Sequence, residues 1–229
     1  MPLILVARRE NLLAELANEL KATYKVDVRI VALDLTLPDA ADQLKAFTDQ
    51  HKLHVSMLVN NAGYGDFGKF HESDKDKQIR MVDLNCRTPV ALSGAFVPAM
   101  VAKKNGAVIF LGSTAAYQPI PLYATYAATK GFDLMFGEAL WGELKPHNVD
   151  VITVCPGGTE TEFQQVANVT SESINNNRVK PEVVVAETMR NLGRKPSFVQ
   201  GAYNSVVSKI YRFFPRRVVI QLAHRFAES

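Results

Sequence analysis

The sequence predicts an α/β protein built on one doubly wound parallel sheet, with three layers of helix, sheet and helix. Short apolar runs alternate along the whole chain with longer stretches whose apolar residues recur at helical spacing. Some of the short runs are continuously apolar, which is typical of strands covered by helices on both faces. The chain has 229 residues, 47% of them hydrophobic and 21% charged, which suits one globular domain over residues 1–229.

The first part of the chain begins directly on an apolar run, LILVA, and leucines at helical spacing follow it. The expected elements are, in order, a strand over 3–7, a helix up to about Tyr24, a strand over 26–33, a helix opened by Pro38 and a strand over 54–59.

The second part continues the alternation. We expect a long helical region over about 74–103 that breaks near Pro89, because proline disrupts helical hydrogen bonding. The remaining expected elements are a strand over 106–112, a helix over 123–144, a strand from 149, a helix after Pro181, a short strand from 197 and a basic helical tail over 203–229.

Composition narrows the function classes. A net charge of +3 is too small to argue for a nucleic-acid partner. Cys86 and Cys155 match no metal spacing, so we expect no metal site and a reducing, cytoplasmic setting. We find no signal peptide and no apolar stretch long enough for a membrane span, so we expect a soluble protein.

Tyr126 and Lys130 are the first candidates for chemistry. They stand four residues apart in YAATK, so on a helix the ammonium lies near the phenol. A positive charge there lowers the tyrosine pKa from its usual value of about 10, which favours proton transfer near neutral pH. An exposed helical tyrosine beside a lysine is the alternative interpretation of this pair.

Further candidates stand where strands or helices end. Ser113 follows the strand over 106–112, where its hydroxyl can meet the same substrate atom as Tyr126. Asn85 precedes the expected break at Pro89, and a helix-end hydrogen bond is its alternative role. NNAG at 60–63 and PGGTET at 156–161 follow strands and let a flat ligand approach the backbone, unless they are ordinary turns.

In this order and spacing, these residues closely resemble the short-chain dehydrogenase/reductase family, whose fold is Rossmann-like. The resemblance runs from residue 3 to about residue 163. It implies that Tyr126 is the catalytic acid/base and that Ser113 polarises the substrate carbonyl or hydroxyl. It also implies that Lys130 holds the nicotinamide ribose, and that Asn85 positions a water that relays protons to Lys130.

The same resemblance implies the cofactor contacts. NNAG lines the adenine side, PGGTET faces the nicotinamide, and Asp34 hydrogen-bonds the adenine. Without the resemblance, Asp34 would be a loop or capping residue. Besides Tyr126 and Lys130, the residues implied are Asp34, Leu35, Asn60, Ala62, Gly63, Pro156, Gly157, Thr159 and Thr161.

Arg8 and Arg9 bear on which nicotinamide cofactor is used. They end the strand over 3–7, at the family position where arginine accommodates a 2′-phosphate, so NADP(H) is expected rather than NAD(H). The family's Gly-rich pyrophosphate turn would lie upstream of Met1. We therefore expect an N-terminally truncated fold that lacks the first strand and helix, through a misassigned start, a trimmed chain or a real truncation.

The resemblance implies an oxidoreductase that interconverts a ketone and a secondary alcohol. We expect the substrate pocket to include Tyr117, Pro119, Tyr123 and Phe163, whose character favours an apolar small molecule. The family is commonly dimeric or tetrameric, so a homo-oligomer is expected. The alternatives are a catalytically silent nucleotide-binding or sensor protein and an inactive truncated fragment.

The tail over 203–229 mixes aliphatic residues and phenylalanines with basic ones. Such an amphipathic helix can lie on an anionic membrane surface. A lid over the substrate pocket or a contact between subunits are the alternatives. The basic residues are Lys209, Arg212, Arg216, Arg217 and Arg225.

Overall fold

The computed structural model describes residues 2–168 and 178–228. The chain divides into two compact units, Met1–His54 and Val55–Ser229. Of the tail, Ser229 and the side chain of Arg212 lie outside the described part.

The smaller unit is a β-α-β-α segment. β1 (Leu3–Ala7) and β2 (Val28–Ala32) pair in parallel over five residues each, and α1 (Glu10–Tyr24) connects them. α1 contacts both strands, and its Leu13 and Ala17, four residues apart, are buried. α2 (Ala40–Gln50) follows β2.

The larger unit contains a four-stranded parallel sheet in the order β3–β4–β5–β6. Its strands are β3 (Met57–Asn60), β4 (Gly106–Leu111), β5 (Val149–Cys155) and β6 (Ser197–Val199). The central strands are buried on both faces, with Val108, Phe110 and Ile152 fully inaccessible, which explains their continuously apolar sequences.

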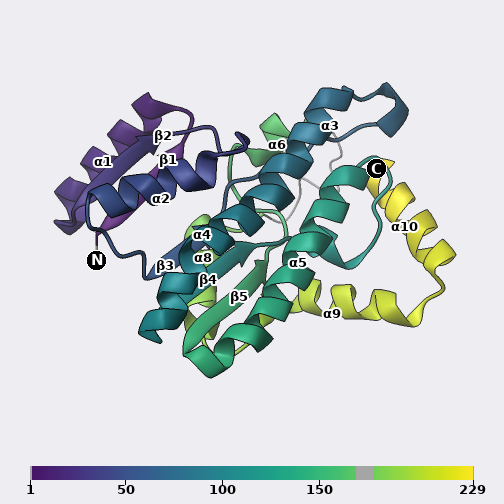
Figure 1. Cartoon of the computed structure of the whole chain (residues 1–229). Coiled ribbons are helices and arrows are strands. Elements are labelled where there is room, and N and C mark those ends of the chain that lie inside the picture. The colour runs from purple at the N-terminus through teal and green to yellow at the C-terminus, as the bar shows by residue number, and fades with distance from the viewer. Residues whose placement is uncertain (1, 169–177, 229) are drawn as a thin grey trace. The chain divides into compact units, whose positions relative to one another are not determined.

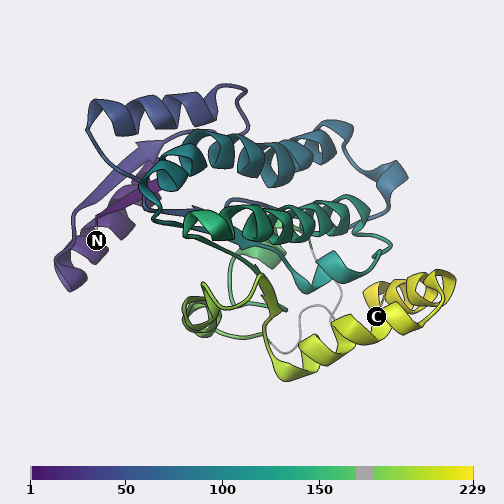
Figure 2. The ribbon, with the colours of Figure 1, turned by 60° about the horizontal axis from the view of Figure 1, so that its bottom comes forward.

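Helices cover both faces of this sheet. α4 (Thr88–Lys103) and α5 (Ala124–Leu144) lie side by side over one face, and α8 (Pro181–Asn191) lies on the other (Figures 1 and 2). The other helices among the described residues of the unit are α3 (Lys75–Val82), α6 (Phe163–Val166), α9 (Ala202–Ile210) and α10 (Arg216–Glu228). Short 3-10 turns span Phe70–Glu72, Thr114–Tyr117, Lys145–His147 and Tyr211–Phe213.

The predicted α/β class is confirmed, with parallel strands flanked by helices. The sequence predicted one sheet that lacks a strand, whereas the described strands pair as two sheets, of two and four strands. The length of a strand depends on the residues that its neighbour offers for pairing. β2 spans Val28–Ala32, shorter than the predicted 26–33, because the five residues of β1 pair with these five.

The predicted helix break near Pro89 is confirmed, and it is a π-helical turn, Asp83–Arg87, between α3 and α4. The N–H of Thr88 bonds to the carbonyl of Asp83, five residues back. Pro89 has no N–H, so the Asn85 carbonyl lacks the usual donor four residues on. The turn widens the helix where Asn85 points into the protein.

Candidate active site

A cavity of about 1070 Å³ opens at the carboxyl ends of the strands in the larger unit. Ser113, Tyr126 and Lys130 line one part of it. Ligands bind at this edge in doubly wound sheets, because loops from neighbouring strands converge there. Apolar residues line much of the rest, among them Ile120, Tyr123, Phe163, Val184, Val207 and Phe226.

Tyr126 lies near the start of α5 and is buried. The Ser113 hydroxyl, just beyond β4, hydrogen-bonds the Tyr126 phenol and also accepts a bond of 3.1 Å from the Ala115 N–H. Burial raises the pKa of Tyr126, while Lys130 and the Ser113 bond act in the opposite direction. The predicted effect of Lys130 is therefore present, but burial outweighs it.

Lys130 is buried, and its ammonium donates two hydrogen bonds. Its Nζ lies 2.6 Å from the Leu111 carbonyl oxygen, 3.0 Å from Asp133 Oδ2 and 5.9 Å from the centroid of the Tyr126 ring. Burial acts to lower the pKa of Lys130, but the Asp133 carboxylate and Tyr126 outweigh it, and the pKa is raised. Lys130 therefore carries its charge beside the phenol.

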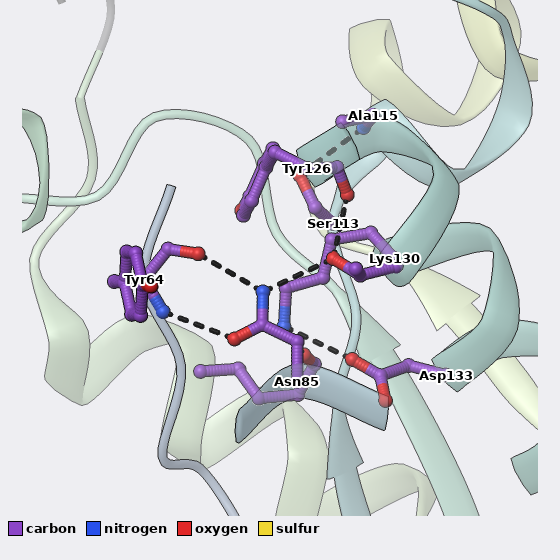
Figure 3. A network of polar contacts seen from close by, with 9 residues as sticks. Tyr64, Asn85, Ser113, Ala115, Tyr126, Lys130 and Asp133 are labelled. Carbon is purple, nitrogen blue, oxygen red and sulfur yellow. Dashed lines mark hydrogen bonds and ion pairs between the residues drawn. The ribbon is translucent and has the colours of Figure 1, made fainter. Parts of the chain in front are cut away.

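Asn85 joins the loop after β3 to α5. Its side-chain Oδ1 accepts a 3.1 Å bond from the Tyr64 N–H, and its Nδ2 donates to Tyr64 O at 2.9 Å and to Thr129 Oγ1 at 3.0 Å. Thr129 Oγ1 in turn donates to the Tyr126 carbonyl. Figure 3 shows Asn85 between Tyr64 and the Lys130–Asp133 pair. The Asn85 side chain is thus engaged with the Tyr64 backbone and the Thr129 hydroxyl.

The loop after β3 approaches Asn85 and Lys130 through Gly63. A Cβ there would lie 3.0 Å from Asn85 Oδ1, so a side chain would crowd the Asn85 amide, and 3.7 Å from Lys130 Nζ, which is an ordinary contact distance. Asn60, at the end of β3, is buried, and neither of its amide atoms has a hydrogen-bond partner among the described residues. Ala62 is exposed.

The PGGTET loop after β5 faces the same cavity. Pro156, Gly157, Thr159 and Thr161 all line it, as predicted for a ligand-binding loop. Gly157 allows α9 to approach, because a Cβ there would lie 2.6 Å from Asn204 Nδ2. The Thr161 hydroxyl accepts a bond from the N–H of Phe163 at the start of α6.

The remaining predicted cofactor residues belong to the smaller unit. Arg8 and Arg9 are exposed, directly after β1, and Arg9 is the N-cap residue of α1. Asp34 Oδ1 accepts bonds from the N–H and the hydroxyl of Thr36, so the carboxylate shapes the turn after β2. Leu35 is buried.

The sequence located only part of the cavity wall. Tyr123 and Phe163 line it as predicted, but Tyr117 and Pro119 do not, because Tyr117 faces Cys155 and Ser197 while Pro119 is exposed. The lid over the pocket, which the sequence left open as a role for the tail over 203–229, agrees with the cavity lining, although the sequence did not show which tail residues face it. α9, the turn Tyr211–Phe213 and α10 supply Tyr203, Val207, Tyr211 and Phe226 to the wall.

Asp133 was also missed, although its position three residues after Lys130 places it on the same helix face. That spacing was the signal available in the sequence.

A family model for short chain dehydrogenases matches residues 1–172 of this chain. The chain belongs to this family. The protein is thus an oxidoreductase that acts on CH–OH donors, in a family that uses NAD(P).

Relatives within the short-chain dehydrogenases are similar over most of their length. A 7beta-hydroxysteroid dehydrogenase of Mediterraneibacter gnavus is 32% identical over 208 residues, which are 89% of this chain and 78% of that protein. A very-long-chain 3-oxoacyl-CoA reductase of Mus musculus is 24% identical over 233 residues, covering 100% of this chain and 72% of that one.

Solved structures of short-chain dehydrogenases share the fold. One from a study of 7beta-hydroxysteroid dehydrogenase stereoselectivity has a TM-score of 0.86 and 27% identity over 97% of this chain and 86% of that chain. A short-chain dehydrogenase from Sphingobium yanoikuyae in complex with NADPH has a TM-score of 0.78 and 25% identity, over 93% and 84% of the two chains.

Proposed function

We propose that this protein interconverts a bulky, apolar ketone and its secondary alcohol with NADP(H). The observation that carries the proposal is the meeting of Ser113, Tyr126 and Lys130 at the wall of one large cavity whose remaining wall is mainly apolar. The two sequence relatives named above support the substrate class, because their names give a hydroxysteroid and a very-long-chain oxoacyl group.

Tyr126 moves the proton in this proposal. During reduction its phenol donates a proton to the oxygen that develops from the carbonyl, while the Ser113 hydroxyl donates a hydrogen bond to the same oxygen. During oxidation the Tyr126 phenolate takes the proton of the alcohol. Lys130 stabilises that phenolate through its charge, and Asn85 holds the loop and helix that frame the three groups.

The residues of the larger unit fit a nicotinamide cofactor. The Asn60 amide has buried atoms without described partners, and the Lys130 ammonium at the cavity wall offers a donor for a ribose hydroxyl. When bound, NADP(H) supplies or accepts the hydride. Arg8 and Arg9 are proposed to favour NADP(H) by pairing with its 2′-phosphate, and the NADPH complex of the similar dehydrogenase supports that choice.

A first experiment measures NADPH oxidation by the purified chain against a panel of ketones, from acetone-sized to steroid-sized. We expect turnover that increases with apolar bulk, because the cavity wall is largely apolar. A cooperative thermal transition that NADPH shifts, without turnover on any ketone, would favour the silent sensor instead. The absence of a cooperative transition would favour the inactive fragment.

We also propose a peripheral membrane contact through the C-terminal segment. Phe213 and Phe214, between α9 and α10, are 86% and 50% exposed, and exposed basic residues such as Arg216 and Arg217 follow them. Aromatic side chains beside basic ones suit an anionic lipid surface. No helix in residues 2–168 and 178–228 is both long and apolar enough to cross a membrane.

Replacing both phenylalanines, Phe213→Ser with Phe214→Ser, tests this contact by flotation with phosphatidylserine vesicles. We expect the vesicle-bound fraction to fall about tenfold, because two aromatic side chains no longer leave water. Phe70→Ser is the matched control, since Phe70 is 67% exposed on a different element. Equal flotation of the double variant and the control would contradict a contact at this segment.

Two further features remain proposals. Exposed Val90 on α4 and Met135 on α5 support a homo-oligomer formed through these helices, and light scattering measures its mass. The free thiols of Cys86 and Cys155 suit a reducing compartment such as the cytoplasm.

A further inference from the structure

Asp133 forms a buried ion pair with Lys130. The two residues lie one helical turn apart on α5, and their side chains are 5% and 6% exposed. Asp133 Oδ2 lies 3.0 Å from Lys130 Nζ, while Oδ1 is buried without a hydrogen-bond partner among the described residues. A carboxylate removed from water is costly unless it is paired, so Lys130 is the group that keeps Asp133 charged in this position.

The pair adjoins the proposed acid/base. The field of the Asp133 carboxylate reaches Tyr126, where it acts against that of Lys130. Because the Asp133 carboxylate and the Lys130 ammonium are buried side by side, the electrostatic field at Tyr126 is that of an ion pair. It is weaker than the field of an unpaired positive charge.

The other titratable groups near the pair remain neutral. Cys86 on the π-helical turn and Cys155 on β5 face it from neighbouring elements. Burial raises the pKa of the Cys86 thiol to about 11 and that of the Cys155 thiol to about 12. Tyr123, at the start of α5, is also buried, and burial raises its pKa. Burial raises the pKa of the Asp133 carboxyl, and its ion pair with Lys130 acts in the opposite direction, so Asp133 is the acidic group that opposes Lys130.

We propose that Asp133 is a positioning residue that holds the Lys130 ammonium beside Leu111 and Tyr126, shares its charge, and thereby sets the pH range in which Tyr126 transfers a proton. This inference rests on the proposed oxidoreductase function. Asp133 does not line the cavity, so it acts through Lys130 rather than on the substrate.

The test is the pH profile of alcohol oxidation by Asp133→Asn. The rising limb of that profile reports the ionisation of Tyr126. Without the carboxylate, the full charge of Lys130 acts on the phenol, so we expect the limb to move about one pH unit toward acid. Glu143→Gln is the control, because it removes an exposed acidic side chain from the same helix and should leave the limb in place.

Each outcome decides the proposal. An unchanged limb in an active Asp133→Asn enzyme, whether or not the rate falls, would show a structural role only. A limb that moves toward alkali would show that Lys130 loses its proton, which also contradicts the proposal. If wild type lacks activity, the proposed function fails, but the role of Asp133 can still be tested. An absorbance titration, with Tyr126→Phe as the reference that lacks the phenol, must then show that Tyr126 ionises at lower pH in Asp133→Asn than in wild type.

A second variant covers a failure of Asp133→Asn to fold. Asp133→Glu keeps the negative charge next to Lys130, so it should restore folding and place the limb within about 0.3 pH units of wild type. The proposal would be overturned if Asp133→Glu folds but the rising limb of its pH profile is displaced as far as is expected for Asp133→Asn.

Discussion

At Tyr126 two opposing effects act on one phenol. Burial favours the neutral phenol, and the neighbouring ammonium of Lys130 favours the phenolate. The raised pKa means that Tyr126 is protonated at neutral pH in the described state, which suits a proton donor in ketone reduction. Oxidation needs the phenolate, so we expect it to accelerate as pH rises.

Arg8 and Arg9 give a separate prediction at the scale of single residues. Replacing both with alanine should weaken NADPH binding about tenfold or more and leave NADH binding unchanged, because only NADPH carries the 2′-phosphate. Titration calorimetry with each cofactor measures this. Arg29→Ala is the control, since Arg29 pairs with Asp27 in the same unit. Equal losses for the two cofactors would contradict a role in selectivity.

Residue spacing predicted some of these contacts and missed others. The i,i+4 spacing of Tyr126 and Lys130 placed the ammonium near the phenol, and 5.9 Å separates Nζ from the ring centroid. The bonds of Asn85 to Tyr64 join residues 21 positions apart, and no local pattern specifies them. Local spacing determines neighbours on one helix, whereas contacts between elements depend on packing.

At the scale of elements, α5 packs closely on β5 because residue 137 is a glycine and has no side chain. A Cβ on Gly137 would clash with Thr153 Oγ1 and lie 3.0 Å from Phe110 Cδ2, and Thr153 is fully buried on β5. Glycine at this position lets the helix that carries Tyr126 and Lys130 pack closely on the sheet.

Gly137→Ala should therefore lower the free energy of unfolding by about 1–3 kcal/mol through overpacking. Gly142→Ala on the same helix has no atom within 4 Å of its added Cβ. It should raise the free energy of unfolding by about 0.5–1 kcal/mol, because alanine loses less backbone entropy. Urea unfolding measures both changes, and a destabilisation equal in the two variants would refute the packing argument.

The elements themselves were largely predictable from apolar periodicity. β1 was predicted to the residue, and the break before Pro89 was predicted without its form, the π-helical turn Asp83–Arg87. The third strand was expected from residue 54, but β3 begins at Met57, where pairing with β4 begins at Ala107. Periodicity reports which residues are apolar, while the partner strand determines where a strand starts.

At the scale of the whole molecule, the proposed roles divide between the two units. The cavity and the groups Ser113, Tyr126 and Lys130 belong to Val55–Ser229. The residues proposed to select NADP(H), Arg8 and Arg9, belong to Met1–His54. The sequence predicted the fold class and that Ser113, Tyr126 and Lys130 lie together, and it left a lid over the pocket open as a role for the tail. It did not show which tail residues line the cavity, because nothing local shows where a tail packs.

We propose above that Tyr126 transfers the proton in a ketone–alcohol oxidoreductase. The most direct measurement compares the rate of NADPH-dependent ketone reduction by wild type, Tyr126→Phe and Tyr24→Phe, alongside the NADPH dissociation constant of each. Tyr24 is 67% exposed on α1, so its variant controls for the loss of a phenol hydroxyl. We predict that Tyr126→Phe lowers turnover about 100-fold or more with cofactor binding unchanged, while Tyr24→Phe changes neither. Turnover by Tyr126→Phe within about twofold of wild type would contradict the account.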